Sequence, residues 1–195
     1  MPLYEPKFSN NSFGYRPAKS IQHAIARCLD FLNSGLVWAV DLDIEKFFDS
    51  VNRHTLLAIL SRDIHDTRVL SLISKFINAP VLKNNQLVHS ASGIPQGGPL
   101  SPLLANILLN ELDSELSRRK ELFVRYADDM LIFCRNEASA FQAAKHLRPF
   151  LEQVLSLRIN NAKTLITHAA SISFLGYGFT ETTDGWIGYN INTQY

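Results

Sequence analysis

The sequence predicts an α+β fold in which an antiparallel sheet carries helices on one face. One observation behind this is the order of elements, because stretches with apolar residues at helical spacing alternate with short strand-like stretches. The other is size: 195 residues, 46% of them hydrophobic, can bury one core arranged as a main domain with a small subdomain.

The N-terminal part is predicted to hold one helix and the first strand. Apolar residues follow helical spacing from Pro17 to about Asn33, and Gly35 provides the stop. Residues 36–44 are typical of a strand, and alternation along them places Asp41 and Asp43 on one face.

The middle of the chain is predicted to be helical and then to turn back on itself. Helices are expected near 53–61 and 65–78, followed by a strand–turn segment over 79–90 that bends at Asn84-Asn85. The segment SGIPQGGP at 92–99 holds two prolines and three glycines, so it is expected to be a loop.

A buried helix is predicted directly after that loop. Ser101 is expected to cap it, Pro102 to occupy its first position, and the helix to run to about Lys120. Its first half, over 103–109, is apolar on most sides and should be deeply buried.

The last third is predicted to contain a hairpin, a helix and several short strands. Strand-like runs flank Asp128-Asp129, and a helix is expected over about 137–155. The apolar stripe of this helix consists of Phe141, Ala144, Leu147, Leu151 and Leu155. The remaining strands are expected near 157–160, 163–167, 172–179 and 185–189.

Composition argues against several classes of protein. The net charge of +1 provides no overall basic field for a nucleic-acid partner, although a local basic lining is compatible with it. Cys28 and Cys134 are too few for a disulfide framework, and the histidines show no metal-ligand spacing. No apolar run approaches the roughly 20 residues of a membrane span, and no signal peptide is evident. We therefore expect a cytoplasmic protein that contacts no membrane.

The adjacent Asp128 and Asp129 have two interpretations. One is a two-residue hairpin turn, although glycine or asparagine is preferred at the second turn position. The other is a metal site, because buried carboxylates require a cation and Asp43 can join them if both elements share one sheet. Oxygen ligands suit Mg²⁺, and two such ions can clamp the oxygens of a phosphoryl transfer. Asp41 is a rival for Asp43, but a solvated or arginine-paired carboxylate is its simpler interpretation.

Four segments resemble, in order and spacing, the motif series of reverse transcriptases. They are DIEKFFD at 43–49, GIPQGGPLSPLLANILL at 93–109, YADD at 126–129 and FLGY at 174–177. The long glycine loop, together with FGYRPAKS at 13–20, resembles the group II intron-encoded branch, which CRISPR-associated and other group II-like bacterial enzymes share. The resemblance covers about residues 4–180. It implies a polymerase palm with a ferredoxin-like sheet plus part of the fingers, and an RNA-directed DNA polymerase of the bacterial cytoplasm.

The resemblance implies a catalytic centre with two Mg²⁺ ions, for which Mn²⁺ could substitute. Its implied metal ligands are the carboxylates of Asp43, Asp128 and Asp129 and the backbone carbonyl of Ile44. Phe47 and Phe48 match the region of the aromatic gate, whose ring excludes a ribose 2′-OH by its bulk. The family pattern points to Phe48, and at least one of the two rings is expected to be core.

Other positions are implied to hold the substrates. Pro95, Gln96 and Gly97 match the loop that touches the incoming nucleotide and its template base, and a tight turn alone does not explain Gln96. Lys163 matches a lysine that protonates or neutralises the departing pyrophosphate, although a lysine on a late strand is ordinarily solvated. The implied primer grip is Phe174, Leu175, Gly176 and Tyr177, and Arg16 and Lys19 are candidates for template or nucleotide phosphates.

The implied partners are an RNA template, a DNA or RNA primer and a dNTP, with group II intron RNA as a further candidate. The implied domains are partial fingers over 1–35, a palm over 36–180 with fingers elements at about 53–100, and a terminal strand over 181–195 that leads towards a thumb. The fingers hairpin, thumb and maturase regions of the family have no counterpart in the sequence. We expect little activity unless those segments, or a partner chain, supply them.

Two other functions are compatible with the residues. A non-catalytic RNA-binding or assembly module would bind structured RNA in a salt-dependent manner without incorporating nucleotides. An RNA-dependent RNA polymerase shares the palm, but the aromatic gate argues against it.

Overall fold

A computed structural model describes residues 2–83, 86–88 and 92–191 of the chain. The helical elements are η1 (Glu5–Lys7), α1 (Ile21–Asn33), α2 (Phe47–Ser50), α3 (Arg53–Ser61), α4 (Thr67–Ile77), α5 (Ser101–Arg118), α6 (Glu137–Pro149), η2 (Phe150–Val154) and η3 (Ala169–Ser171). The strands are β1 (Trp38–Leu42), β2 (Val81–Lys83), β3 (Gln86–Val88), β4 (Leu122–Tyr126), β5 (Asp129–Cys134), β6 (Leu165–His168), β7 (Ser173–Phe174), β8 (Tyr177–Thr182) and β9 (Gly185–Asn190).

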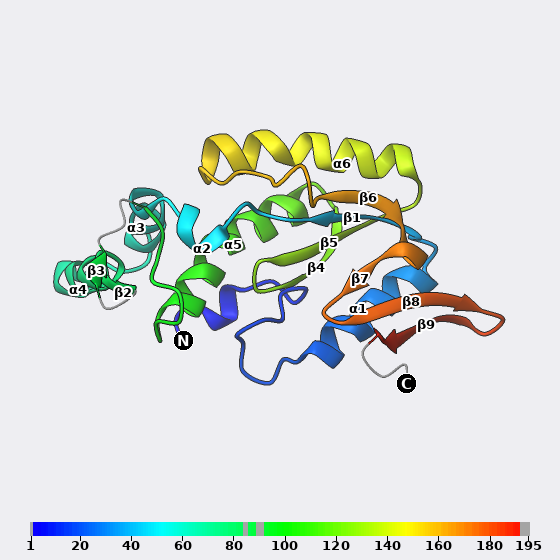
Figure 1. Cartoon of the computed structure of the whole chain (residues 1–195), viewed down its shortest axis with the longest axis horizontal. Coiled ribbons are helices and arrows are strands. Elements are labelled where there is room, and N and C mark those ends of the chain that lie inside the picture. The colour runs from blue at the N-terminus through cyan, green and yellow to red at the C-terminus, as the bar shows by residue number, and fades with distance from the viewer. Residues whose placement is uncertain (1, 84–85, 89–91, 192–195) are drawn as a thin grey trace.

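The main sheet has the order β4-β5-β1-β6, and all of its pairings are antiparallel. With α5 between β1 and β4, and α6 between β5 and β6, this is the ferredoxin-like arrangement that the sequence predicts (Figure 1). β1 is an interior strand, since Asp41 is opposite Leu131 of β5 on one side and opposite Leu165 of β6 on the other. The end of β1 therefore lies beside the start of β5.

The two faces of this sheet are covered differently. Val40 and Leu42 point into a core shared with α5 and α6, whereas Ala39 points into a second core shared with α1 and with the sheet β7-β8-β9. The expected helices on one face are thus α5 and α6. The other face is covered by α1 together with the second sheet, because α1 presents an apolar stripe of its own (Figure 1).

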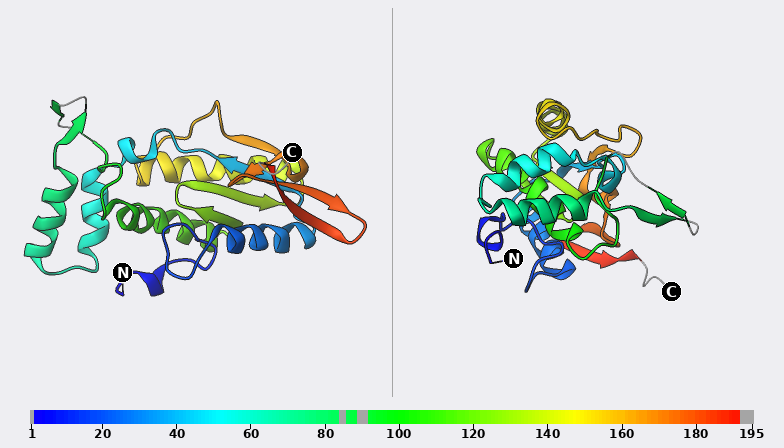
Figure 2. Two further views of the ribbon diagram at one scale, coloured as in Figure 1. Left: turned by 60° about the horizontal axis from the view of Figure 1, so that its bottom comes forward. Right: turned by 90° about the vertical axis from the view of Figure 1, so that its left-hand side faces the viewer.

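A helical extension, formed by α3, α4 and the β2–β3 hairpin, projects from one end of the molecule (Figure 2). The two helices occupy the stretches that periodicity predicts, and α4 begins after Asp66, whose side chain accepts a hydrogen bond from the Arg68 amide. The expected bend at Asn84-Asn85 falls outside the described residues. The short helix α2 was not predicted, and it begins after Lys46, which has a positive φ of 43°.

Three helix details differ from the sequence prediction. Helix α1 begins at Ile21 and not at Pro17, because the Ser20 side chain accepts from the His23 amide as the N-cap. Ser101 is the first residue of α5 and not its cap, since its hydroxyl donates to the Pro95 carbonyl. Phe141 is 58% exposed, because the face of α6 that meets the sheet carries Ala140, Ala143 and Leu147.

The C-terminal strands are also divided differently. The expected strand at 172–179 is interrupted at Leu175 and Gly176, whose φ angles of 54° and 79° form a tight turn between β7 and β8. Positive φ at both central residues is the pattern of a type I′ hairpin, which suits the twist of paired strands. Over 157–160 only an isolated bridge forms, between Ile159 and Ile44.

Candidate active site

The hairpin that carries Asp128 and Asp129 is offset by one residue from the expected turn. Tyr126 is opposite Asp129 in the β4–β5 pairing, so the two turn residues are Ala127 and Asp128. Ala127 has a positive φ of 58°. Asp129 is therefore the first residue of β5, and the pair is not itself the turn. Asp128 therefore lies at the tip of the hairpin, and Asp129 lies at the start of β5.

Asp43 follows directly after β1 and is held by its backbone. Its amide donates to the Thr164 hydroxyl at 3.2 Å, and its carbonyl accepts from the Asn160 amide at 2.9 Å. Two residues further on, the Glu45 amide donates to the Arg158 carbonyl at 2.9 Å. These bonds extend the edge between β1 and the chain before β6, so that the Asp43 side chain is positioned by a rigid part of the sheet.

A cleft of about 530 Å³ brings together seven of the predicted site residues. Its predicted members come from separate elements of the fold and are Asp43, Ile44, Phe47, Phe48, Gln96, Asp128 and Lys163. Four lining residues were not predicted: Glu45, Lys46, Asp49 and Asn160. Lys163 is exposed on the cleft wall, in the turn before β6.

The carboxylates of this region repel one another. Burial raises the pKa of Asp129, and the charges of Asp128 and Asp43 raise it further. Burial also raises the pKa of Asp41 to about 6, with contributions from Asp129 and Asp43. Asp41 therefore belongs to the same cluster. Asp41 is half-buried, and none of the ion pairs between described residues includes it, so it is not the arginine-paired carboxylate of the simpler interpretation.

The donor set fits a hard cation that is also bound by a substrate. Among the described residues, no three carboxylate, imidazole or thiolate side chains are already grouped as ligands around one point. Mg²⁺ does not require such a cage, since it is usually bound through one or two carboxylates plus waters and substrate phosphates. Asp43 and Asp128 both line the cleft, and Asp129 is close enough for both of their charges to raise its pKa, so these carboxylates meet that requirement.

The two phenylalanines of α2 have different environments. Phe47 is 3% exposed and belongs to the core shared with α5 and α6, which confirms that at least one ring is structural. Phe48 is half-buried and packs edge-on against it, with ring centroids 5.2 Å apart and planes at 78°. The Phe48 ring is thus braced from behind while it lines the cleft.

The loop that carries Gln96 is packed against α2. The Ile94 amide donates to the Phe48 carbonyl at 2.8 Å, and the Gly93 amide donates to the Val51 carbonyl at 2.9 Å. A Cβ atom at Gly93 would lie 2.6 Å from the Phe48 carbonyl oxygen, so only glycine allows this approach. Gln96 is exposed on the cleft side of this loop, Pro95 is half-buried, and Gly97 has a positive φ of 81°.

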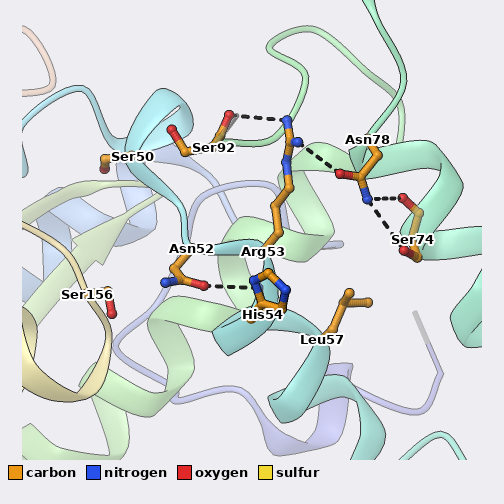
Figure 3. A pocket seen from close by; sticks show the side chains of 9 residues that line it. All are labelled: Ser50, Asn52, Arg53, His54, Leu57, Ser74, Asn78, Ser92 and Ser156. Atoms are coloured by element: carbon orange, nitrogen blue, oxygen red, sulfur yellow. Dashed lines mark hydrogen bonds between the residues drawn. The ribbon is translucent and has the colours of Figure 1, made fainter. Parts of the chain in front are cut away.

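Arg53 anchors the same loop from the other side. Its guanidinium donates to the carbonyls of Gly93 at 2.7 Å and Ser92 at 3.2 Å, and to the Asn78 side chain at 2.9 Å. Figure 3 shows Arg53 reaching between Ser92 and Asn78 in a polar pocket of about 320 Å³ beside the cleft. Sequence reasoning missed Arg53, because nothing at the start of a helix marks an arginine that will bind a distant loop.

Two predicted phosphate contacts lie elsewhere. The Arg16 side chain is 5% exposed, pairs with Glu5, and donates to the carbonyls of Ser9 and Ser12. Lys19 donates to the Asn10 carbonyl at 3.3 Å and stands 4.8 Å above the Phe13 ring, in a separate hollow beside α1. Neither lines the cleft. Arg16 is committed to holding the N-terminal segment together, which a phosphate contact would disrupt.

The residues of the predicted primer grip form the β7–β8 turn. Phe174 is buried in the second core, while Leu175 and Tyr177 are half-buried. In Figure 1 this turn and the β4–β5 turn both point towards the left, the end at which α2 lies. None of the four residues lines the cleft.

Within the described part of the chain, no helix has the length and apolar character that a membrane crossing requires.

Comparisons with known proteins identify the family of the chain. Residues 1–179 match the family model described as reverse transcriptase (RNA-dependent DNA polymerase). The group II intron-encoded protein LtrA of Lactococcus lactis subsp. cremoris is 30% identical over 95% of this chain and 42% of its own length. Protein YkfC of Escherichia coli K12 is 30% identical over 90% of this chain and 56% of its own length. The chain thus spans about half the length of these relatives, and the expected resemblance to the group II branch is confirmed.

The fold also matches a solved polymerase. A telomerase from Candida tropicalis, in complex with a fragment of telomeric RNA, superposes with a TM-score of 0.75 at 15% identity. The match covers 100% of this chain and 36% of the telomerase chain. At this identity the likeness shows the fold alone, and it confirms the polymerase palm.

Proposed function

Because the chain belongs to the reverse transcriptase family, we propose that its cleft binds a primer terminus, an RNA template and a deoxynucleoside triphosphate and extends the primer. The observation that carries the proposal is that three segments converge on one cleft. They contribute Asp43 and Phe48, Gln96, and Asp128. In the reaction, the primer 3′-OH forms a bond to the α-phosphate, and the bond from that phosphate to the pyrophosphate breaks.

The carboxylates are proposed to hold the metal. Reverse transcriptases generally use divalent metal ions, and we infer two Mg²⁺ ions held by Asp43, Asp128, Asp129 and the Ile44 carbonyl, with Mn²⁺ as a substitute. When bound, such ions neutralise the charge that develops on the attacking and leaving oxygens. Mutual repulsion among the aspartates supports this, because a cation removes it.

The other cleft residues are proposed to select and orient the substrates. Phe48, braced by Phe47, excludes a ribose 2′-OH by bulk, and the Gln96 amide hydrogen-bonds the nucleotide or its template base. Lys163 donates a proton to the leaving pyrophosphate or neutralises it. The turn at Leu175-Gly176, with Phe174 and Tyr177 on either side, grips the primer.

The wider setting follows from the relatives. We propose fingers elements over 1–35 and about 53–100, a palm over 36–180, and a link towards a thumb over 181–195. Group II intron RNA is a candidate partner and the bacterial cytoplasm the setting, as the bacterial LtrA and YkfC suggest. Further segments, in cis or on a partner chain, would supply the rest of the grip.

The direct test is extension of a primer on an RNA template by the purified chain with Mg²⁺ and dNTPs. We expect slow incorporation by the wild type, none by Asp128→Ala, and wild-type behaviour for Asp184→Ala, which removes an exposed carboxylate in the distant β8–β9 turn. A second readout is Mn²⁺ binding followed by electron paramagnetic resonance, which Asp128→Ala should weaken. Equal incorporation by the wild type and Asp128→Ala would refute the proposal. Salt-dependent RNA binding without any incorporation would favour the non-catalytic alternative.

A further inference from the structure

The largest fully buried side chain among the described residues is that of a charged residue, Arg125. It lies on β4 and points to the face covered by α5, away from the cleft carboxylates. Its partner Asp113 is also buried, and the two form a fork with Nε–Oδ1 and Nη2–Oδ2 distances of 2.8 and 2.6 Å. The charge of the arginine is therefore neutralised inside the protein.

The remaining nitrogen of this guanidinium reaches the catalytic hairpin. Nη1 donates to the Ala127 carbonyl at 2.8 Å and to Oδ1 of Asn106 at 2.8 Å. The Asn106 amide in turn donates to the Gly14 carbonyl at 2.9 Å. One buried network thus joins α5, the N-terminal segment and the turn that precedes Asp128.

Fixing the Ala127 carbonyl constrains Asp128. The carbonyl belongs to the peptide group that connects the two residues, and this group is planar, so its orientation sets the direction in which Asp128 leaves the turn. Ala127 has a positive φ of 58°, a conformation that is unfavourable for a residue with a Cβ atom and persists only where the surroundings impose it. The hydrogen bond from Arg125 to the Ala127 carbonyl is one interaction that imposes this conformation.

The N-terminal segment also packs against this hairpin. The Phe13 amide donates to the Arg125 carbonyl, and the Arg125 amide donates to the Asn11 carbonyl, both at 2.8 Å. A Cβ atom at Gly14 would lie 2.2 Å from the Ala127 nitrogen, so this glycine packs directly on the turn. The glycine of the FGYRP motif is thereby explained by a close backbone approach.

We propose that Arg125, with Asp113 and Asn106, is a positioning device that holds Asp128 in place for metal binding. The proposal rests on the proposed polymerase function and names residues that touch no substrate. A buried ion pair is not the least costly way to stabilise a core, because apolar side chains of similar size often do as well. Its placement against the Ala127 carbonyl gives the pair a specific use.

The experiment separates position from stability. In Arg125→Met/Asp113→Leu the charges disappear together, so the fold is expected to survive while the Ala127 carbonyl loses its donor. Arg125→Lys keeps the positive charge but cannot form the two-pronged bond to Asp113. It replaces the double variant in the experiment if the double variant does not fold. Arg119→Lys is the control, since it alters an arginine–carboxylate pair on α5 that does not contact the hairpin.

Two readouts are measured on the 195-residue chain. The first is hydrogen exchange of amides 126–130 without metal, expected to become about tenfold faster in both variants while amides of β1 stay protected. The second is Mn²⁺ affinity by electron paramagnetic resonance, expected to fall about 10- to 100-fold, as for other groups that orient metal ligands. In the wild type, amides 126–130 should exchange more slowly than the exposed β8–β9 turn.

Three results would overturn the proposal. The first is a folded Arg125 variant whose amide exchange and Mn²⁺ affinity equal those of the wild type. The second is a loss of Mn²⁺ affinity no larger than the loss in Arg119→Lys. The third is rapid exchange of amides 126–130 in the wild type. If the wild type binds Mn²⁺ no better than Asp128→Ala, the proposed function fails instead. The exchange measurement then still decides whether Arg125 holds the turn.

Discussion

The β4–β5 hairpin lies between a paired aspartate on one side and a group of unpaired aspartates on the other. On the α5 face, Asp113 is buried and receives a fork from Arg125 at 2.6–2.8 Å. On the cleft side, Asp43, Asp128 and Asp129 have no ion pair among the described residues, and the pKa of Asp129 is raised by burial and by its neighbours. Asp113 and the cleft aspartates therefore differ in whether the protein supplies their counter-charge.

The contrast indicates what each group is for. A carboxylate that receives its cation from the protein is fixed and unreactive, and it can serve as an anchor. Carboxylates left without one are unstable together, and any cation that enters the cleft is attracted to them. The protein thus pairs the charge that contacts the hairpin and supplies no counter-charge to the carboxylates beside the cleft.

The largest expected effect comes from breaking the paired group. Arg125→Met leaves Asp113 buried without its partner, and we expect a loss of about 3–5 kcal/mol in the free energy of unfolding. Asp43→Asn removes one of the repelling charges, so it should change stability little or raise it. Urea unfolding of the two variants in metal-free buffer makes the comparison. If Arg125→Met lost less unfolding free energy than Asp43→Asn, the paired and the unpaired carboxylates would not differ as described.

The sequence predicted the unpaired group far better than the paired one. Asp43 and Asp128 interrupt apolar stretches of the sequence, and such interruptions are visible without any knowledge of the fold. Alternation even placed Asp41 on the face of Asp43, although its membership of the cluster depends on Asp129 across the sheet. The pairing of Arg125 with Asp113 left no local pattern, because it joins a strand to a helix whose packing only the fold defines.

The same distinction applies to the fold. Periodicity located α3, α4 and the body of α5, since each carries its own apolar face. It misplaced Phe141, because the choice between two adjacent stripes on α6 depends on how the helix rotates against the sheet. The resemblance made Arg16 a candidate for phosphate contact, whereas in the structure its guanidinium is bonded to Glu5 and to backbone carbonyls.

A smaller effect should come from titrating the unpaired group. The pKa of Asp41 is about 6 in the folded protein, above the ordinary value of 3.8, so the folded state binds a proton more tightly than the unfolded state. Stability should therefore fall as the pH rises from about 4 to 6, and the penalty is complete above that window. Asp41→Asn should flatten this slope and be more stable than the wild type at pH 7, with no advantage at pH 4. Thermal unfolding in the presence of EDTA at both pH values measures it. A wild-type slope that persists in Asp41→Asn would assign it to other groups.

The smallest effect is expected for a paired carboxylate that is not buried. Glu152 is bonded to Arg148 at 3.0 Å, with 40% and 44% of the side chains exposed. Because water and salt screen such a pair, Glu152→Gln should cost only about 0.3–0.5 kcal/mol, and the difference should vanish in 1 M salt. Urea unfolding at low and high salt tests this. If Glu152→Gln lost nearly as much unfolding free energy as Arg125→Met, ion pairing alone would explain the contribution of Asp113. The expected gap of several-fold would mean that burial, and not pairing alone, makes the Arg125–Asp113 pair costly to break when one partner is removed.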